Sequence, residues 1–316
     1  MKILFVRFSS LGDVALTTGV MQYVSQMLPD AEIDVLTYAE YTPIFANLPF
    51  VQNVFGYEKS RGISEYFYIV QNEFEEHDYI FDLHGKIRSK FLKFHSKASY
   101  HCYKKDSKAR RAFVKNRKLN DRLDMHVVEK YFESVIKPLG IPMPELEALR
   151  PVLVRHVETI NKKVFVHTFA SKTTKAYPYA KELAEKLIEN GYTHIFGGVG
   201  NAPQVEGIID NTGKIDLNEM LDIIASCEFA ISTDSGPMHL AIGLNKPTIG
   251  IFGSTTKHFG FYPSFKDCYV LEDNSVECRP CDVHGLDKCP KEHFKCMNSL
   301  KPKLVIDLLA QMKVSE

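Results

Sequence analysis

Short apolar runs alternate with longer amphipathic segments from the start of the chain. The run Ile3–Phe8 is short and ends in a polar Ser-Ser-Leu-Gly turn, which is the pattern of a buried strand. The next segment, Val14–Leu28, repeats apolar residues at helical spacing and stops before Pro29. Strands in series with room for helices between them predict a parallel sheet covered on both faces. Further strands are predicted at Ile33–Tyr38, Val51–Tyr57 and Tyr79–Leu83.

The alternation begins again after a proline-rich stretch between residues 138 and 151. The chain is therefore expected to form two doubly wound α/β domains, residues 1–150 and 151–300, followed by a C-terminal helix at 301–316. Ligands of such sheets bind outside the carboxyl ends of the strands, so both domains are expected to face a central cleft. The second series predicts strands at Lys163–Thr168, His194–Phe196, Phe229–Ser232 and Thr248–Phe252, and helices at Tyr179–Asn190, Leu217–Ser226, Gly236–Gly243 and Leu304–Met312.

Composition agrees with a soluble globular protein. The chain has 316 residues, of which 45% are hydrophobic and 25% charged, and this excludes a disordered, collagen-like or coiled-coil chain. Its 39 basic and 39 acidic residues cancel, so overall charge predicts no polyanionic partner. No apolar stretch approaches the ~18–20 residues of a membrane-spanning helix, and the apolar N-terminus is too short for a signal peptide. The protein is therefore expected to be cytoplasmic, with reduced thiols.

A polar turn follows the first predicted strand directly. It reads Ser9-Ser10-Leu11-Gly12-Asp13 and leads at once into a helix, whose first N–H groups have no partner within the helix. The turn lacks both the G-x-G-x-x-G fingerprint and the Gly-Lys-Ser/Thr of a Walker A loop. Asp13 is predicted either to cap the helix, for about 1 kcal/mol, or to act as a general base. Spacing alone slightly favours the cap.

A second polar turn, Ser232–His239, joins a predicted strand to a helix with Pro237 near its start. Asp234 could cap this helix. However, N–H groups and hydroxyls at a helix N-terminus also bind anions, because the helix dipole favours negative charge there. An Asp-Ser-Gly turn followed by His239 is therefore predicted to seat a phosphate.

A lysine-containing loop, Lys172–Pro178, follows the predicted strand Lys163–Thr168. A lysine in such a loop can neutralise a phosphate as a point charge. On spacing alone, an ordinary solvated loop lysine is the better interpretation.

The strongest compositional feature is the segment from Lys86 to Arg122. It contains fourteen basic residues and only two acidic ones, in a chain that is neutral as a whole. One sign of charge rarely gathers this far without a partner, because like charges repel. Nucleic acid, anionic lipid head groups and a phosphorylated glycolipid would each be a partner of complementary charge. The charge of the segment does not distinguish among these three partners.

A cysteine-rich stretch lies near the C-terminus and also contains two histidines. Its first cysteine pair has zinc-ligand spacing, and four thiolates could complete a tetrahedral site. Four reduced cysteines that pack a small loop are the alternative. The cysteines are Cys278, Cys281, Cys289 and Cys296, and the histidines are His284 and His293.

Together, these motifs resemble glycosyltransferase family 9, the bacterial heptosyltransferases of lipopolysaccharide core assembly. The resemblance covers nearly the whole chain and depends on the turn Ser9–Asp13, the Lys175-x-Tyr177-Pro178 loop and the block Ser232–Ala241. It implies two Rossmann-like domains in the GT-B arrangement, with the nucleotide-sugar donor on the C-terminal one. It also implies transfer of heptose from ADP-heptose with inversion and without a catalytic metal.

The resemblance assigns roles residue by residue. Asp13 matches the general base, and Lys175 matches the lysine on the donor diphosphate. The other donor-binding positions are Glu206, Asp234, Ser235, Gly236 and His239. An anionic glycolipid, a phosphorylated lipid A–inner core, is the expected acceptor, at Ser10, Gly12, Lys86, Arg88, Arg110, Arg111 and Lys115. Some autotransporter heptosyltransferases that resemble the chain bind iron at a similar segment, which favours a structural zinc or iron ion at Cys278, Cys281, Cys289 and Cys296.

The sequence therefore predicts a glycosyltransferase that needs no cofactor for catalysis. Asp13 would take the proton of the acceptor hydroxyl, while helix N–H groups, Lys175 and His239 stabilise the leaving diphosphate. Peripheral contact with the inner membrane is expected, and a nucleic-acid partner is not. Two rival functions remain: a protein heptosyltransferase of the autotransporter type, and a non-enzymatic nucleotide or nucleic-acid binder that uses residues 86–122.

Overall fold

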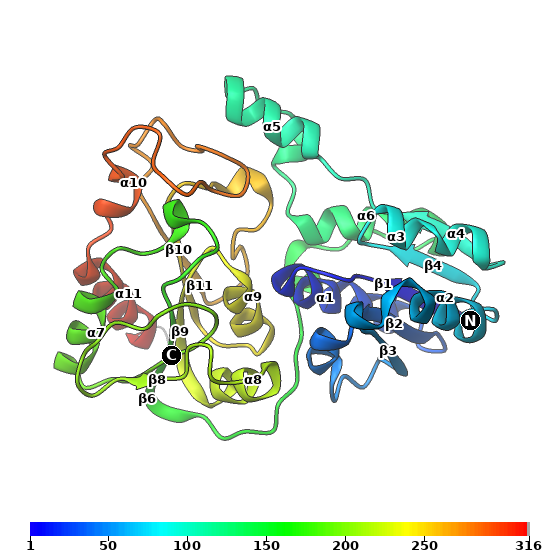
Figure 1. Cartoon of the computed structure of the whole chain (residues 1–316), viewed down its shortest axis with the longest axis horizontal. Helices are drawn as coiled ribbons and strands as arrows, with labels where there is room; N and C mark the ends of the chain where they lie inside the picture. Colours follow the sequence, from blue (N-terminus) through cyan, green and yellow to red (C-terminus); the bar gives the residue numbers. More distant parts are fainter. Residues whose placement is uncertain (315–316) are drawn as a thin grey trace. The chain divides into compact units, whose positions relative to one another are not determined.

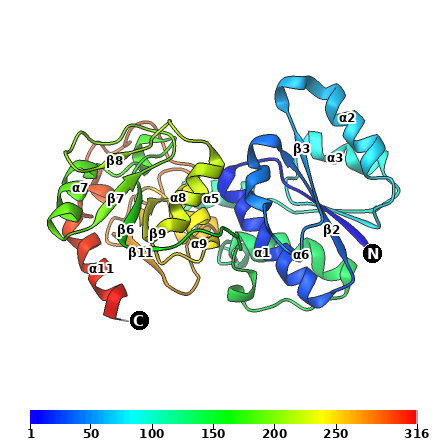
Figure 2. The ribbon, with the colours of Figure 1, turned by 90° about the horizontal axis from the view of Figure 1, so that it is seen from below.

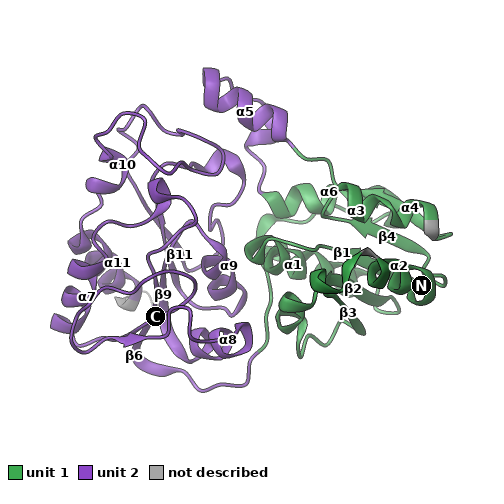
Figure 3. Ribbon diagram, in the orientation of Figure 1, with its two compact units in different colours: residues 1–105, 127–154 green, residues 106–126, 155–316 purple. Residues whose placement is uncertain are grey.

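The computed structural model describes residues 1–314, apart from the side chains of Ile63, His95, Lys313 and Val314. The chain divides into two compact units (Figure 3). Unit 1 comprises Met1–Lys105 and Val127–Val154, and unit 2 comprises Asp106–His126 and the chain from Arg155 onward. Each unit has its own parallel sheet and its own hydrophobic core.

Unit 1 is built around a five-stranded parallel sheet in the order β3-β2-β1-β4-β5 (Figure 1). The connections alternate strand and helix, as the hydrophobic pattern predicted. Its strands are β1 (Lys2–Val6), β2 (Glu32–Tyr38), β3 (Asn53–Tyr57), β4 (Tyr79–Asp82) and β5 (Ser99–Cys102), and its α-helices are α1 (Leu11–Met27), α2 (Gly62–Glu73), α3 (Ile87–Lys90), α4 (Leu92–His95) and α6 (Val127–Leu139).

The core of unit 1 forms because alternate residues of its strands point to opposite faces of the sheet. Leu4 and Val6 of β1 pack with Tyr66 and Val70 of α2. Helices α1 and α6 lie side by side (Figure 2). The chain after α6 also approaches α1 closely, since a Cβ atom at Gly19 would lie 2.2 Å from the carbonyl oxygen of Leu149. Only glycine fits α1 at that point.

Unit 2 contains a six-stranded parallel sheet in the order β11-β10-β9-β6-β7-β8. Helices α7 and α11 contribute to one core with the central strands. None of the helices within residues 1–314 is long and apolar enough to span a membrane. The strands are β6 (Ile160–His167), β7 (Thr193–Phe196), β8 (Ile209–Asp210), β9 (Cys227–Thr233), β10 (Thr248–Phe252) and β11 (Cys268–Glu272), and the α-helices are α5 (Ser107–Asn116), α7 (Ala180–Glu189), α8 (Leu217–Ser226), α9 (Gly236–Gly243), α10 (Lys295–Asn298) and α11 (Pro302–Val314).

Each sheet has one place where the strand order reverses direction. In unit 1 this is between β1 and β4, and in unit 2 it is between β6 and β9. The loops that leave two such strands run to opposite faces of the sheet, so a crevice opens at their carboxyl ends, and ligands of α/β sheets bind there. Asp13 follows β1, Lys175 follows β6 and Asp234 follows β9. These three predicted site residues therefore lie at the switch points.

The predicted strands and helices are confirmed within the described residues, with ends shifted by a few residues. Residues 315 and 316 of the predicted C-terminal helix lie outside the described residues. The hydrophobic pattern did not predict β5, β8 and β11, which are edge strands. Most of their residues are only half-buried. Partly exposed edge strands have no continuous apolar run, and this is why the pattern did not reveal them.

The expected domain boundary at residue 150 requires a correction. The chain does change units close to that point, but residues 106–126 belong to unit 2 rather than to the first domain. Phe113 and Leu123 of this segment pack with Phe259. Arg117 also donates hydrogen bonds to the carbonyl oxygens of Cys278 and Pro280, both at 2.9 Å. Contacts between residues distant in the sequence, and not chain continuity, decide the membership of this segment.

Candidate functional site

The carboxylate of Asp13 lies at the start of α1, directly after β1. Its Oδ1 accepts a hydrogen bond from the Tyr131 hydroxyl at 2.7 Å and pairs with Arg7 Nη2 at 2.8 Å. Its Oδ2 accepts from the Ser10 hydroxyl at 2.6 Å and from the Ser10 backbone N–H at 3.3 Å. Asp13 thus takes part in the first turn of α1, and residues outside that turn hold it as well.

The surroundings of Asp13 keep its carboxyl group ionised. Burial alone would raise its pKa, but the charge of Arg7 and hydrogen bonds from Ser10 and Tyr131 outweigh burial and lower the pKa to about 2. Burial raises the pKa of Tyr131 well above its usual value, so this hydroxyl remains a donor. At neutral pH the site therefore holds a carboxylate beside a guanidinium and a neutral phenol.

Positive charge gathers at this edge of unit 1. Burial, together with the nearby charges of Arg7, Lys105 and Lys86, lowers the pKa of His84 to about 3. His84 is therefore neutral at neutral pH. The positive charge around it comes from Arg7, Lys86 and Lys105. The guanidinium of Arg88 donates to the Tyr38 hydroxyl at 3.1 Å. Of the predicted acceptor-binding residues, unit 1 carries Ser10, Gly12, Lys86 and Arg88.

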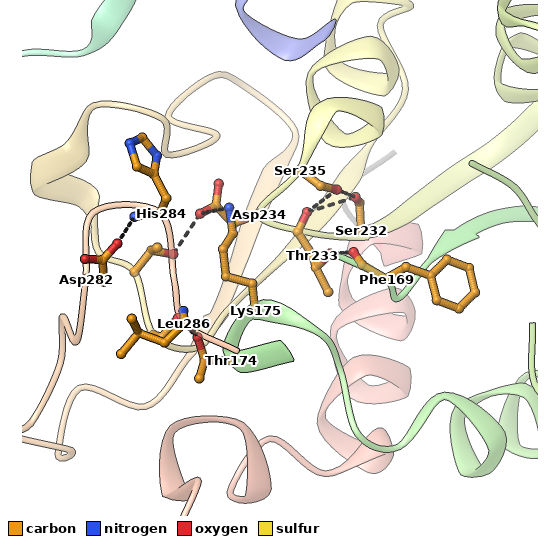
Figure 4. A network of polar contacts seen from close by, with 12 residues as sticks. Phe169, Thr174, Lys175, Ser232, Thr233, Asp234, Ser235, Asp282, His284 and Leu286 are labelled. Atoms are coloured by element: carbon orange, nitrogen blue, oxygen red, sulfur yellow. Dashed lines mark hydrogen bonds and ion pairs between the residues drawn. The ribbon is translucent and has the colours of Figure 1, made fainter. Parts of the chain in front are cut away.

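Unit 2 brings together Lys175 and Asp234, two of the residues that were predicted to bind the donor. Lys175 ends the 3₁₀ turn η5 (Thr173–Lys175) after β6, and its Nζ lies 2.9 Å from Asp234 Oδ2. The Thr255 hydroxyl, from the turn after β10, donates to the same oxygen at 2.8 Å. The Lys175 and Asp234 side chains keep 17% and 14% of their surface exposed. Figure 4 shows both side chains at this edge of the sheet.

The N-terminus of α9 lies in the turn that carries Asp234. The Ser235 hydroxyl donates to the Thr233 carbonyl oxygen at 3.1 Å and lies 3.2 Å from the Ser232 hydroxyl (Figure 4). It makes no capping hydrogen bond to α9, so the N-cap side chain does not occupy the first-turn N–H groups. His239 is buried in the same turn. A helix N-terminus beside Lys175 has the chemistry of an anion site.

The other predicted binding residues lie in unit 2 and differ in exposure. Glu206 is exposed in the connection between β7 and β8 and makes no hydrogen bond or ion pair with the part of the chain that the structure describes. Arg111 and Lys115 are exposed on α5, whereas Arg110 is only 8% exposed. The guanidinium of Arg110 lies 5.2 Å from the ring centroid of Phe261. Arg110 therefore packs inside unit 2 and is not a surface cation like the other two.

The four cysteines of the stretch 278–296 are free thiols that lie near one another. Burial raises the pKa of Cys281, and the neighbouring Cys278 and Cys289 raise it further; burial chiefly raises that of Cys296 to about 11. Sulfur and imidazole are suitable zinc or iron ligands. However, no three His, Cys, Asp or Glu side chains within the described residues are arranged to hold one ion. The arrangement does not fit a bound metal, and metal binding at this stretch stays a prediction.

The sequence did not predict three residues that contact Asp13 or Asp234. Arg7 and Tyr131 hold Asp13, and Thr255 holds Asp234. Arg7 gave a signal, because it is a charged residue at the end of an otherwise apolar run. Thr255 belongs to the segment Phe252–Thr255, which continues the family pattern, but no role was predicted for it. Tyr131 gave no signal, since it reaches Asp13 only through the fold.

Each unit thus carries polar side chains at the strand switch point of a Rossmann-like parallel sheet, and in unit 2 these side chains have the chemistry of an anion site. The family model described as glycosyltransferase family 9 (heptosyltransferase) matches residues 71–285. The lipopolysaccharide heptosyltransferase 1 of Campylobacter coli is 24% identical to this chain, with 99% of each chain covered. The crystal structure of the glycosyl transferase family 9 from Veillonella parvula covers 100% of this chain and 97% of its own, at 17% identity and a TM-score of 0.73.

A second solved structure, the E. coli heptosyltransferase WaaC with ADP, covers 99% of this chain and 100% of its own, with a TM-score of 0.71 at 19% identity. The chain therefore belongs to glycosyltransferase family 9 (heptosyltransferase). The predictions of an α/β fold of the GT-B type and of a glycosyltransferase are confirmed.

Proposed function

We propose that this enzyme transfers a heptose from an ADP-heptose donor to a lipopolysaccharide inner-core acceptor, with inversion at the anomeric carbon. The observation that carries the proposal is the pair of polar edges, one with an ionised carboxylate and one with a lysine beside a helix N-terminus. Family membership and the heptosyltransferase names of the relatives support the sugar and the acceptor.

Unit 2 would bind the donor. A departing nucleoside diphosphate gains negative charge as the bond to the sugar breaks, and fixed positive groups stabilise that charge. Lys175, His239 and the first-turn N–H groups of α9 would supply them. The Lys175–Asp234 pair holds the lysine at the anion site before a ligand arrives, which lowers the entropy lost on binding.

Unit 1 would supply the base. The acceptor hydroxyl passes its proton to the carboxylate of Asp13 while its oxygen bonds to the anomeric carbon, and the bond from that carbon to the diphosphate breaks and releases ADP. One displacement inverts the configuration. A pKa of about 2 makes Asp13 a weak base in the free enzyme. The carboxylate is nevertheless fully ionised at neutral pH, and proton transfer becomes favourable as the acceptor oxygen loses electron density in the transition state.

The acceptor would be anionic, because Arg7, Lys86 and Lys105 place positive charge around Asp13. A phosphorylated lipid A–inner core carries the complementary charge. The basic residues of α3 and α4 extend the same positive surface of unit 1, and Lys90 and Lys93 are exposed there.

The same helices support a peripheral contact with the cytoplasmic face of the inner membrane. Ile87 and Phe94 are 80% and 77% exposed among these lysines, and such a mixture of apolar and basic side chains is typical of helices that rest on anionic bilayers. Flotation with vesicles of phosphatidylglycerol and phosphatidylcholine tests the contact. Phe94→Ser should reduce binding, and Tyr269→Ser, on an edge strand of unit 2, is the control.

The proposed reaction is tested by incubating the purified protein with ADP-heptose and a lipid A–inner core acceptor. Mass spectrometry should show addition of one heptose, and NMR of the product should show the inverted anomeric configuration. UDP-glucose in place of ADP-heptose is the control donor. Transfer of glucose but not of heptose would contradict the donor assignment, and a retained configuration would contradict the role of Asp13.

A further inference from the structure

The cysteine-rich stretch contacts the loop that carries Lys175. We define the loop tip as Gly285–Asp287, within the long connection between β11 and α10. The Thr174 backbone N–H donates to the Leu286 carbonyl oxygen at 3.0 Å, and the Leu286 N–H donates in return to Thr174 Oγ1 at 2.7 Å. Figure 4 shows Leu286 and Thr174 facing each other beside Lys175. These reciprocal hydrogen bonds join two segments more than a hundred residues apart.

A charged contact strengthens this junction. Lys172 Nζ lies 3.0 and 2.9 Å from the two carboxylate oxygens of Asp287. The loop tip therefore contacts Lys172, the residue just before η5, and Thr174 in the middle of η5.

The loop tip also lies directly on the side chain of Lys175. Gly285 has a φ of +83°, and a Cβ atom there would lie 2.9 Å from Lys175 Cγ and 3.1 Å from Lys175 Cδ. A side chain at position 285 would thus displace the aliphatic part of Lys175. The absence of a side chain, together with the positive φ, lets the backbone of the tip cover the lysine.

The base of the cysteine-rich stretch is fixed to the rest of the donor edge. Arg279 is buried, pairs with Glu272 at 2.7 Å and donates to the Thr255 carbonyl oxygen at 2.8 Å. The Cys281 N–H donates to the Ser254 carbonyl oxygen at 3.2 Å. Since the Thr255 hydroxyl holds Asp234, one continuous set of contacts connects the stretch to both members of the Lys175–Asp234 pair.

We propose that the loop tip Gly285–Asp287 is a positioning element that holds Lys175 against the diphosphate of the donor. The proposal rests on the function proposed above for Lys175. A lysine has a flexible four-carbon stem, and binding an anion costs the entropy of fixing that stem. Packing by the tip restricts the stem in advance, so donor affinity depends on residues that do not touch the donor.

The first experiment compares two glycine substitutions by calorimetric titration with ADP. Gly285→Ala should weaken ADP binding about tenfold, because the new methyl group moves Lys175. Gly213→Ala is the matched control: its φ is +65°, so it meets the same backbone strain, but a Cβ atom there has nothing within 4 Å. Gly213→Ala should leave the ADP affinity unchanged. Equal ADP affinity in the two variants would overturn the proposal.

A double-mutant cycle separates the proposal from the function that it assumes. If the tip acts through Lys175, Gly285→Ala should have no further effect on ADP binding in a Lys175→Ala background. Additive losses would overturn the positioning role while leaving the donor site in place. Unchanged ADP affinity in Lys175→Ala itself would overturn the proposed role of Lys175, and the positioning role with it.

A second pair of variants covers the case in which Gly285→Ala does not fold. Thr174→Val removes the oxygen that accepts the Leu286 N–H, whereas Thr174→Ser keeps it. The valine variant should bind ADP several-fold more weakly, and the serine variant should restore the affinity to that of the unchanged protein. Loss of ADP affinity in both variants, or in neither, would contradict a role for this hydrogen bond in positioning Lys175.

Discussion

The switch points of the two units hold an aspartate beside a basic residue, yet the surroundings differ. Asp13 of unit 1 is held by Arg7, Tyr131 and Ser10, and its pKa falls to about 2. Asp234 of unit 2 receives Lys175 and Thr255 and lies next to the start of α9. The site of unit 1 therefore exposes a negatively charged carboxylate. The site of unit 2 instead offers a lysine and helix N–H groups to an anionic ligand.

This difference teaches how one fold can serve two chemical roles. Both sites follow parallel strands at a reversal of strand order, so the backbone offers the same crevice in each. In unit 1 the helix start is occupied by the carboxylate of Asp13, whereas in unit 2 the Ser235 hydroxyl bonds back to Thr233 and does not cap α9. Which group occupies the helix start decides whether the first-turn N–H groups of that helix can bind a further anion.

The largest expected effect tests Asp13. Asp13→Ala should reduce transfer by about 10³-fold, because general-base catalysis contributes roughly 10²- to 10⁴-fold. ADP affinity should stay the same, because the proposed donor groups belong to unit 2. The measurements are kcat by product mass and ADP affinity by calorimetry.

Asp216→Ala is the matched control for Asp13, because Asp216 caps α8 through the Glu219 N–H at 2.9 Å. Losing a cap costs about 1 kcal/mol of stability and no catalysis. If Asp13→Ala retained transfer and lost only as much stability as Asp216→Ala, Asp13 would be a cap alone.

The next effect tests the anion site of unit 2. Lys175→Ala should weaken ADP binding by ~10- to 100-fold, since a hydrogen bond to a charged group contributes about 1.5–3 kcal/mol. Lys181→Ala, an exposed lysine of α7, should bind ADP normally. An equal ADP affinity in these two variants would show that the Lys175–Asp234 pair is structural only.

A third effect concerns pH and follows from the lowered pKa of Asp13. A carboxyl group whose pKa falls from 3.8 to about 2 on folding stabilises the native state above pH ~4, and this contribution is lost as pH falls toward 2. The stability advantage over Asp13→Asn should therefore shrink by about 2 kcal/mol across that window, measured by urea unfolding. A difference that stays constant down to pH 2 would contradict the ion pair with Arg7.

The smallest effect tests the exposed cations of α5. Arg111→Ala with Lys115→Ala should raise the KM for the acceptor a few-fold at low salt and leave the KM for the donor unchanged, because exposed charges act over a screening length of ~8 Å at physiological salt. Arg110→Ala should instead lower the melting temperature, since Arg110 is buried over Phe261. If Arg110→Ala changed the KM for the acceptor but left the melting temperature unchanged, Arg110 would be an acceptor-binding residue and not a packing residue.

Much of the fold could be predicted because the signals are local. Each central strand is a short apolar run that stops at a polar turn, and several helices, such as α7 and α8, repeat their apolar residues at helical spacing. The same property placed Asp13 and Asp234 at the ends of strands. The edge strand β5 and the membership of residues 106–126 escaped prediction, since both depend on partners elsewhere in the chain.

The sequence by itself determined the alternation of strands and helices, the two polar turns and the residues that they carry, because backbone geometry links hydrophobic spacing to secondary structure. Only the tertiary structure decided the electrostatics. Arg7 and Tyr131 reach Asp13, and the Gly285–Asp287 tip reaches Lys175, across long stretches of chain. Charge and burial act through space, and the distances that set them exist only once the chain has folded.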